Sequence, residues 1–99
     1  MEKLRIQASR KYHLLSCHRY FVFTGHKEYD ESIILTITNE SGAICFTFTD
    51  LTTNEVVEYD NPKTGEYIIP LKKGNKTKLT IVASKAIGAY KIVKKTIIE

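Results

Sequence analysis

Apolar and polar residues alternate along most of this chain, and this period of two constrains the fold more than any other feature of the sequence. In residues 4–8, for example, every second residue is apolar and the residues between are charged or polar. Successive side chains of a strand point to opposite faces, so such a segment predicts a strand with one face toward a core. The same pattern returns in residues 33–38, 44–49, 67–71, 79–83 and 89–93.

Two further segments, Tyr20–Thr24 and Glu55–Tyr59, complete a set of about eight short strands spaced roughly ten residues apart. Short strands at this spacing, separated by turn residues, are typical of packed antiparallel sheets and not of a parallel α/β architecture. The sequence therefore predicts an all-β fold, an antiparallel β-sandwich of the jelly-roll or immunoglobulin-like kind. Its length of 99 residues predicts a single domain over positions 1–99.

Three segments carry more specific expectations. Residues 33–38 and 44–49 are joined by Asn39–Gly42, a compact turn sequence, and together they predict a β-hairpin. Pro70 has no N–H to donate to a ladder, so the strand over residues 66–71 is expected at a sheet edge or locally interrupted. Arg10–Arg19 is poorly periodic, and we expect a crossover loop or one short helical turn there.

The inward positions of the alternating segments predict the hydrophobic core. Phe46 lies on the second strand of the predicted hairpin, and we expect its side chain to be buried. The predicted core consists of Leu4, Ile6, Val22, Ile33, Leu35, Ile37, Ile44, Phe46, Phe48, Tyr67, Ile69, Leu79, Ile81, Tyr90 and Ile92.

The charges are segregated along the chain, although the net charge is only +4. Residues 1–27 and 67–99 are basic, whereas residues 28–66 hold nine acidic residues and one lysine. Neighbouring strands of a sandwich can bring such segments together, so balance within the chain is the simplest interpretation. The charge segregation also allows an acidic segment of one molecule to attract a basic segment of another.

Few residues form a constellation suited to catalysis or metal binding. Cys17 lies near His13 and His18, but neighbours along a chain seldom supply the geometry of a nucleophile and its base, and no nucleophile elbow surrounds the cysteine. His13 and Cys17 would share one face of a helical turn, yet no second pair of ligands follows at a conventional spacing. The sequence predicts no catalytic residue, no metal and no cofactor, and hence a protein that is not an enzyme.

The apolar runs are short. The longest, such as Ile33–Leu35, are a few residues, far fewer than the roughly 20 that a membrane-spanning helix needs. Met1–Lys3 leads directly into the first alternating segment without an apolar signal region. We therefore expect no membrane partner and a cytoplasmic location, or a secreted protein only if a signal peptide has been removed.

One stretch resembles a known type of module. Gly65–Gly74 has the sequence G-E-Y-I-I-P-L-K-K-G and is followed by Leu79–Ile81 and Ile87–Ile92. This order resembles the C-terminal part of bacterial jelly-roll modules of the pre-peptidase C-terminal and carbohydrate-binding type, and it covers about a third of the chain. The resemblance implies a jelly-roll sandwich. The chain has no tryptophan, the residue that often forms the sugar-binding platform of such modules, so the resemblance implies more about the fold than about a ligand.

A non-enzymatic interaction module is the function that this sequence favours. The expected partner is a protein, either another chain or a second copy of this one, and a carbohydrate is less favoured. Several strands are apolar on both faces, and the candidate interface residues Ile34, Ile68 and Val82 occupy the side opposite the predicted core. A homodimer is the simplest cover, because a two-fold contact uses one patch twice.

The alternative hypothesis is a binder of nucleic acid or another polyanion. Residues 67–99 hold eight lysines with two tyrosines nearby, and basic grooves with aromatic platforms bind single strands. All these cations are lysines without the planar fork of arginine, so nucleic acid is an unfavoured partner. The candidate polyanion-binding residues are Lys72, Lys73, Lys76, Lys78, Lys91 and Lys94.

Overall fold

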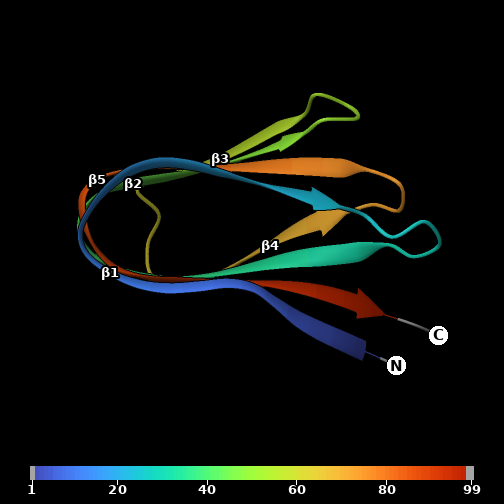
Figure 1. The fold of residues 1–99 in the computed structure, drawn as a ribbon, viewed down its shortest axis with the longest axis horizontal. Coiled ribbons are helices and arrows are strands. Elements are labelled where there is room, and N and C mark those ends of the chain that lie inside the picture. The colour runs from blue at the N-terminus through green and yellow to red at the C-terminus, as the bar shows by residue number, and fades with distance from the viewer. Residues whose placement is uncertain (1, 98–99) are drawn as a thin grey trace.

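Three long antiparallel strands, each bent back on itself, form the frame of the structure (Figure 1). This computed structural model describes residues 2–97. In Figure 1 the long strands curve round at one end of the molecule, and both chain ends lie at the opposite, open end. The strands are β1 (Glu2–Thr24), β2 (Glu31–Asp50), β3 (Val56–Asp60), β4 (Gly65–Leu71) and β5 (Lys76–Ile97).

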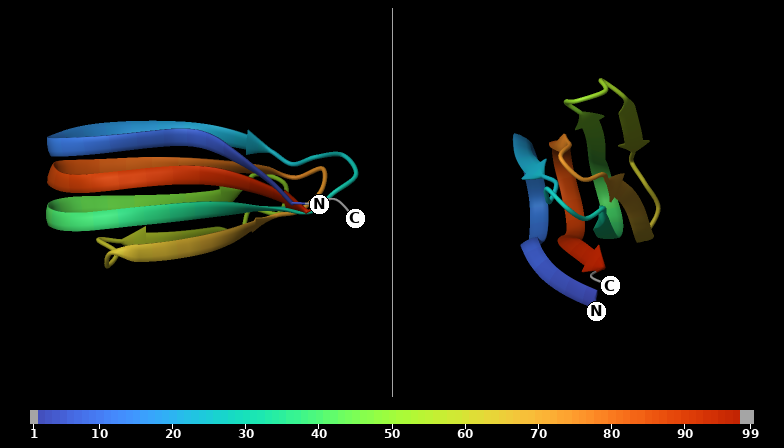
Figure 2. Two further views of the ribbon diagram at one scale, coloured as in Figure 1. Left: turned by 90° about the horizontal axis from the view of Figure 1, so that it is seen from below. Right: turned by 90° about the vertical axis from the view of Figure 1, so that its right-hand side faces the viewer.

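The bends divide one continuous sheet into two layers. β5 lies between β1 and β2, and both short strands pair with the other side of β2. β4 pairs with residues 31–37 of β2 and forms the first layer with the start of β1 and the end of β5. β3 pairs with residues 45–49 and forms the second layer with the end of β1 and the start of β5. The left view of Figure 2 shows the strands side by side in this order.

Counted by layer, the chain forms two sets of four antiparallel strand segments with the connectivity of a jelly roll. The prediction of an all-β antiparallel sandwich is confirmed. The number of strands differs, because β1, β2 and β5 each run through two of the eight predicted segments without a break in the strand.

Each long strand changes layer through a bend with irregular backbone. Leu14 on β1 and Lys85 on β5 adopt left-handed φ angles of 55° and 49°, and Gly42 on β2 has a φ of 80°. The pairing registers of β1 and β2 shift at these places. Irregularities of this kind bend a strand and increase its twist, so the sheet turns the corner while its strands remain paired.

Asn39–Gly42 lies in one of these bends and is not a hairpin turn. The two halves of β2 that it joins both pair with β5 and not with each other, so the hairpin prediction is wrong. A Cβ atom at Gly42 would lie 2.1 Å from the carbonyl oxygen of Lys85, in the bend of β5. The two bends are therefore packed closely against each other, and the glycine permits this approach.

Two other local predictions have opposite outcomes. Arg10–Arg19 belongs to β1, so the prediction of a loop or helical turn there is wrong, and its poor periodicity arises because the strand bends between Tyr12 and Cys17. Pro70 lies on β4, which pairs with β2 on one side only. The prediction of an edge strand at Pro70 is confirmed within the described part of the chain.

The core fills the space between the two layers. Phe46, Leu35 and Ile92 are fully enclosed, as the alternation predicted. The predicted core residues that are buried are Ile33, Leu35, Ile37, Ile44, Phe46, Phe48, Ile69, Leu79, Ile81, Tyr90 and Ile92. The structure adds Tyr12, Leu15, Phe23, Leu71, Ala83 and Ala86.

The prediction that Leu4 and Ile6 belong to the core is wrong, since their side chains are 65% and 63% exposed. Ile6 lies opposite Val93, but Ala8 lies opposite Ile92, so two steps along β1 match one step along β5. Such a β-bulge reverses the inward and outward positions on one side of it. Ala8 packs against the core, and Leu4 and Ile6, before the bulge, point outward.

Val22 is also exposed, at 50%, and its assignment to the core is wrong. Every residue from Tyr20 to Thr24 except the last is apolar, so alternation cannot tell which face is inward. The larger rings of Phe21 and Phe23 take the inward positions. Tyr67, another predicted core residue, is only partly buried, and its ring packs against Tyr59 at 4.8 Å between centroids.

Candidate interaction face

Four apolar residues lie directly opposite one another across the whole outer face of the first layer. Ile6 pairs with Val93, Val93 with Ile34, and Ile34 with Ile68. Ile6 and Ile68, at the two edges, are 63% and 61% exposed, while the two central side chains are partly exposed. We call this set the outer apolar row; it comprises Ile6, Val93, Ile34 and Ile68.

Two more exposed apolar side chains extend the row toward the open end of the molecule. Leu4 lies two residues from Ile6 on β1, and Pro70 lies two residues from Ile68 on β4. Strand residues two apart share a face, so both lie on the same outer surface as the row. Lys95 and Ser32 occupy the positions between them on the central strands.

A polar line borders the row on the side of the bends. It comprises Ser9, Lys91, Thr36 and Glu66, which are paired across the four strands. Lys91 and Glu66 are exposed and are separated within the line by Thr36. The face thus has an apolar band with one positive and one negative group along its border.

The three predicted interface residues do not lie together. Ile34 and Ile68 are direct cross-strand partners in the row. Val82 is 47% exposed on the outer face of the second layer, where its neighbours are His18 and Cys45. Sequence reasoning missed Ile6 and Val93 because it placed the first in the core and gave the second no role.

The outer face of the second layer is more polar. Tyr20 lies in line with Thr80 and Thr47, and the Lys78 ammonium lies 4.8 Å from the centroid of the Tyr20 ring. The acidic side chain of Glu58 ends the same line on β3. Apolar residues on this face are interrupted by threonines and charges, so they do not form a row.

The six candidate polyanion-binding lysines are distributed over separate regions. The connection between β4 and β5 contains Lys72 and Lys73, and β5 begins at Lys76. The outer face of the first layer carries Lys91, whereas the outer face of the second layer carries Lys78. The sixth, Lys94, is engaged within the protein. The structure therefore does not bring these lysines into one patch.

Lys94 links β5 to β2 and to the end of β1 at the open end of the sandwich. Its ammonium group lies 3.3 Å from a carboxylate oxygen of Glu31 and donates a hydrogen bond of 2.9 Å to the carbonyl oxygen of Thr24. Burial raises the pKa of the Glu31 carboxyl, but hydrogen bonds from the Thr96 hydroxyl, the His26 N–H and Lys94 outweigh burial and hold that pKa below its usual value. The buried carboxylate is therefore a structural group.

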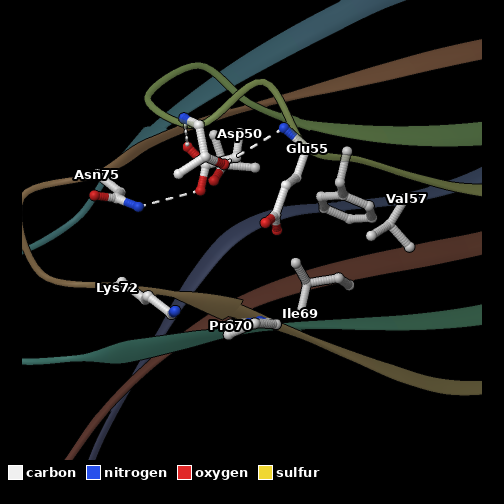
Figure 3. A pocket seen from close by; sticks show the side chains of 10 residues that line it. Asp50, Glu55, Val57, Ile69, Pro70, Lys72 and Asn75 are labelled. Atoms are coloured by element: carbon white, nitrogen blue, oxygen red, sulfur yellow. Dashed lines mark hydrogen bonds between the residues drawn. The ribbon is translucent and has the colours of Figure 1, made fainter.

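A small pocket opens between the layers at the edge formed by β3 and β4 (Figure 3). Val57 and Ile69 face it from the two layers, with Glu55 and Lys72 at its rim. Asp50 accepts hydrogen bonds from the N–H groups of Thr52 and Thr53 and from the Asn75 amide, which hold its pKa below the usual value. These hydrogen bonds hold the carboxylate in the loop after β2.

The cysteines and histidines do not assemble into a reactive site. Cys17 points toward the core, whereas its neighbour His18 lies on the opposite face of β1 and His13 is exposed at the bend. Burial raises the pKa of the Cys45 thiol, which disfavours the reactive thiolate. Within residues 2–97 no three His, Cys, Asp or Glu side chains are placed to hold a metal ion. The described residues also include no helix able to cross a membrane.

Comparison with known proteins identifies no family for the chain. No family model and no curated protein matches it. Among solved structures, the Macrobrachium rosenbergii nodavirus P-domain is similar with a TM-score of 0.40 and 16% sequence identity. The match covers 97% of this chain and 92% of the P-domain chain. A functional assignment therefore depends on the chain's own residues.

Proposed function

We propose that this protein is a non-enzymatic protein-interaction module and that the outer apolar row is its binding surface. The observation that carries the proposal is the direct pairing of four apolar side chains across the full width of one layer. The outer face of an antiparallel sheet in water is normally polar, and a contiguous apolar patch with a polar border is typical of a binding surface.

A purely structural role explains only part of the row. Cross-strand apolar pairs stabilise a sheet, which accounts for Ile34 and Val93 in the middle. Ile6 and Ile68 at the edges remain more than half exposed and gain little from such pairing. The bulge in β1 turns Ile6 outward, next to this band and away from the core. A partner that covers the face would bury both edge residues.

Polyanion binding receives less support from the arrangement of the lysines. A groove for a nucleic acid strand needs cations along one path with aromatic side chains between them. Here Lys94 is held by Glu31, and Lys78 and Lys91 lie on opposite faces of the sandwich. A protein partner for the apolar face is the better-supported proposal.

Site-specific photocrosslinking tests the proposal. Benzoylphenylalanine replaces Ile68 in the protein produced by its native host, and Val82, which is similarly exposed on the second layer, is the matched control position. We expect discrete protein adducts from position 68, fewer from position 82, and their loss when Ile34→Lys places a charge in the row. Equal labelling from both positions, or adducts insensitive to Ile34→Lys, would contradict the proposal.

A further inference from the structure

We propose that the partner at the outer apolar row is a second copy of this chain, bound face to face about a two-fold axis that runs parallel to the strands. This inference rests on the proposed function, because it identifies the partner of the same surface. The argument depends on the order of the four strands in the first layer, β1–β5–β2–β4, and on which residues share each line across them.

A two-fold axis along the strands, midway between β5 and β2, reverses the strand order and keeps each line in place. Each β1 then lies over the partner's β4, and each β5 over the partner's β2. Ile6 meets the partner's Ile68, and Val93 meets the partner's Ile34. The outer apolar row is in this way complementary to itself, as an isologous interface requires.

The same rotation places Leu4 over the partner's Pro70, so the flanking apolar pair is covered too. In the bordering polar line, Glu66 on β4 lies over the partner's Ser9, beside the partner's Lys91 on the adjacent strand. Within one chain these two groups are separated by Thr36 on β2. In the dimer each Glu66 is therefore one strand position away from a Lys91, instead of two as in the single chain, and the two-fold axis repeats this contact.

The other two-fold arrangement of the face has a less favourable charge distribution. An axis across the strands would keep the strand order and reverse the direction of each strand. β4 would then lie over the partner's β4, and Glu66 would meet the partner's Pro70. The Glu66 carboxylate would be covered by an apolar ring, away from the partner's Lys91, and burying a carboxylate without a partner is costly, so this arrangement is disfavoured.

The size of the face predicts a weak dimer. Four strands about 4.8 Å apart and three lines about 7 Å apart span roughly 400 Å² on each copy. Two such faces amount to about 800 Å², which is below the range of about 1,200–2,000 Å² for stable complexes. We therefore expect a monomer at nanomolar concentration and a dimer at high micromolar concentration.

Cross-linking between variants that each carry one added cysteine tests the geometry. Ile6→Cys and Ile68→Cys proteins are mixed and treated with a short bis-maleimide, and the links are mapped by mass spectrometry. Cys17 faces the core and Cys45 lies on the second layer, so the parent protein is the background control. We expect a link from position 6 to position 68 in the mixture. Predominant links from position 6 to position 6 would overturn the proposed axis.

A charge exchange tests the same contact independently. Glu66→Lys and Lys91→Glu should each raise the dimer dissociation constant several-fold in sedimentation experiments, and the double exchange should restore it to within about two-fold, since it returns opposite charges to the contact. A double variant no better than either single variant would overturn the inference. If the purified chain does not dimerise but position 68 still forms site-specific adducts with other proteins, self-association is wrong and the proposed function stands. If position 68 forms no adducts, both are wrong.

Discussion

Ile6 lies opposite Val93 on β5, whereas Ala8, two residues later on β1, lies opposite the adjacent residue Ile92. The extra residue is Gln7, which is exposed and donates a hydrogen bond of 3.2 Å to the carbonyl oxygen of Arg5. The bulge keeps Ala8 against the core while Ile6 stays in the outer apolar row. One unpaired residue in an edge strand thus allows the apolar face to reach β1.

Deletion of Gln7 should therefore leave both sides of β1 in their present register. Without the extra residue, Ile6 and Ala8 would occupy consecutive positions opposite Val93 and Ile92. We expect the free energy of unfolding, measured by urea denaturation, to change by less than about 1 kcal/mol. The control is deletion of Lys91 from β5, which would reverse the faces of the strand on one side of it and should prevent folding. A comparable loss in both variants would contradict the role assigned to Gln7.

Gly42 and Gly74 form a matched pair for testing the bend of β2. Their φ angles are 80° and 76°, but a Cβ at Gly42 would meet the Lys85 carbonyl oxygen at 2.1 Å and one at Gly74 would meet nothing within 4 Å. Gly74→Ala should cost about 1–2 kcal/mol from backbone strain alone. Gly42→Ala should cost at least about 2 kcal/mol more, because the bends must separate. Equal costs in thermal unfolding would show that the bends are not closely packed.

Phe46 is, with Phe48, one of the two largest fully buried side chains of the described core, and it packs edge-on against Tyr90 at 6.1 Å between ring centroids. Phe46→Ala should lower the free energy of unfolding by about 3–5 kcal/mol, through lost burial and the cavity that remains. Val82→Ala on the outer face of the second layer is the control and should cost less than about 1 kcal/mol. A loss below about 1 kcal/mol for Phe46→Ala, in chemical denaturation, would be inconsistent with the inward register of β2.

Glu31 should make the protein sensitive to acid. Its pKa in the folded state is below the ordinary value of 4.5, so the unfolded chain takes up the proton first as the pH falls. The stabilisation is complete above pH 4.5 and is lost as the pH falls through the lower folded pKa. Glu31→Gln should therefore destabilise the protein by about 1–3 kcal/mol at pH 7 and by progressively less below pH 4.5.

Urea denaturation of the parent and Glu31→Gln proteins between pH 7 and pH 3 measures this difference. Glu66→Gln, at an exposed site on β4, is the control and should run parallel to the parent at protein concentrations too low for association. A gap between parent and Glu31→Gln that stays constant across the whole range would rule out the titration of Glu31 as its cause.

The sequence by itself determined where strands form and, in the central strands, which side faces the core. Ile33, Leu35 and Phe48 alternate with more polar neighbours, and alternation is a local property of the extended backbone, so their burial follows directly. Pro70 marked an edge strand for an equally local reason, the missing N–H group.

Only the tertiary structure decided how these segments pair. Whether Asn39–Gly42 reverses the chain or bends one strand depends on hydrogen bonds with β5, more than thirty residues further along the sequence. The outward position of Ile6 depends on a bulge, which exists only relative to the register of β5. The same holds for the outer apolar row: Ile34 and Ile68 lie together, and Val82 lies on the other layer, because non-local strand pairing places them there.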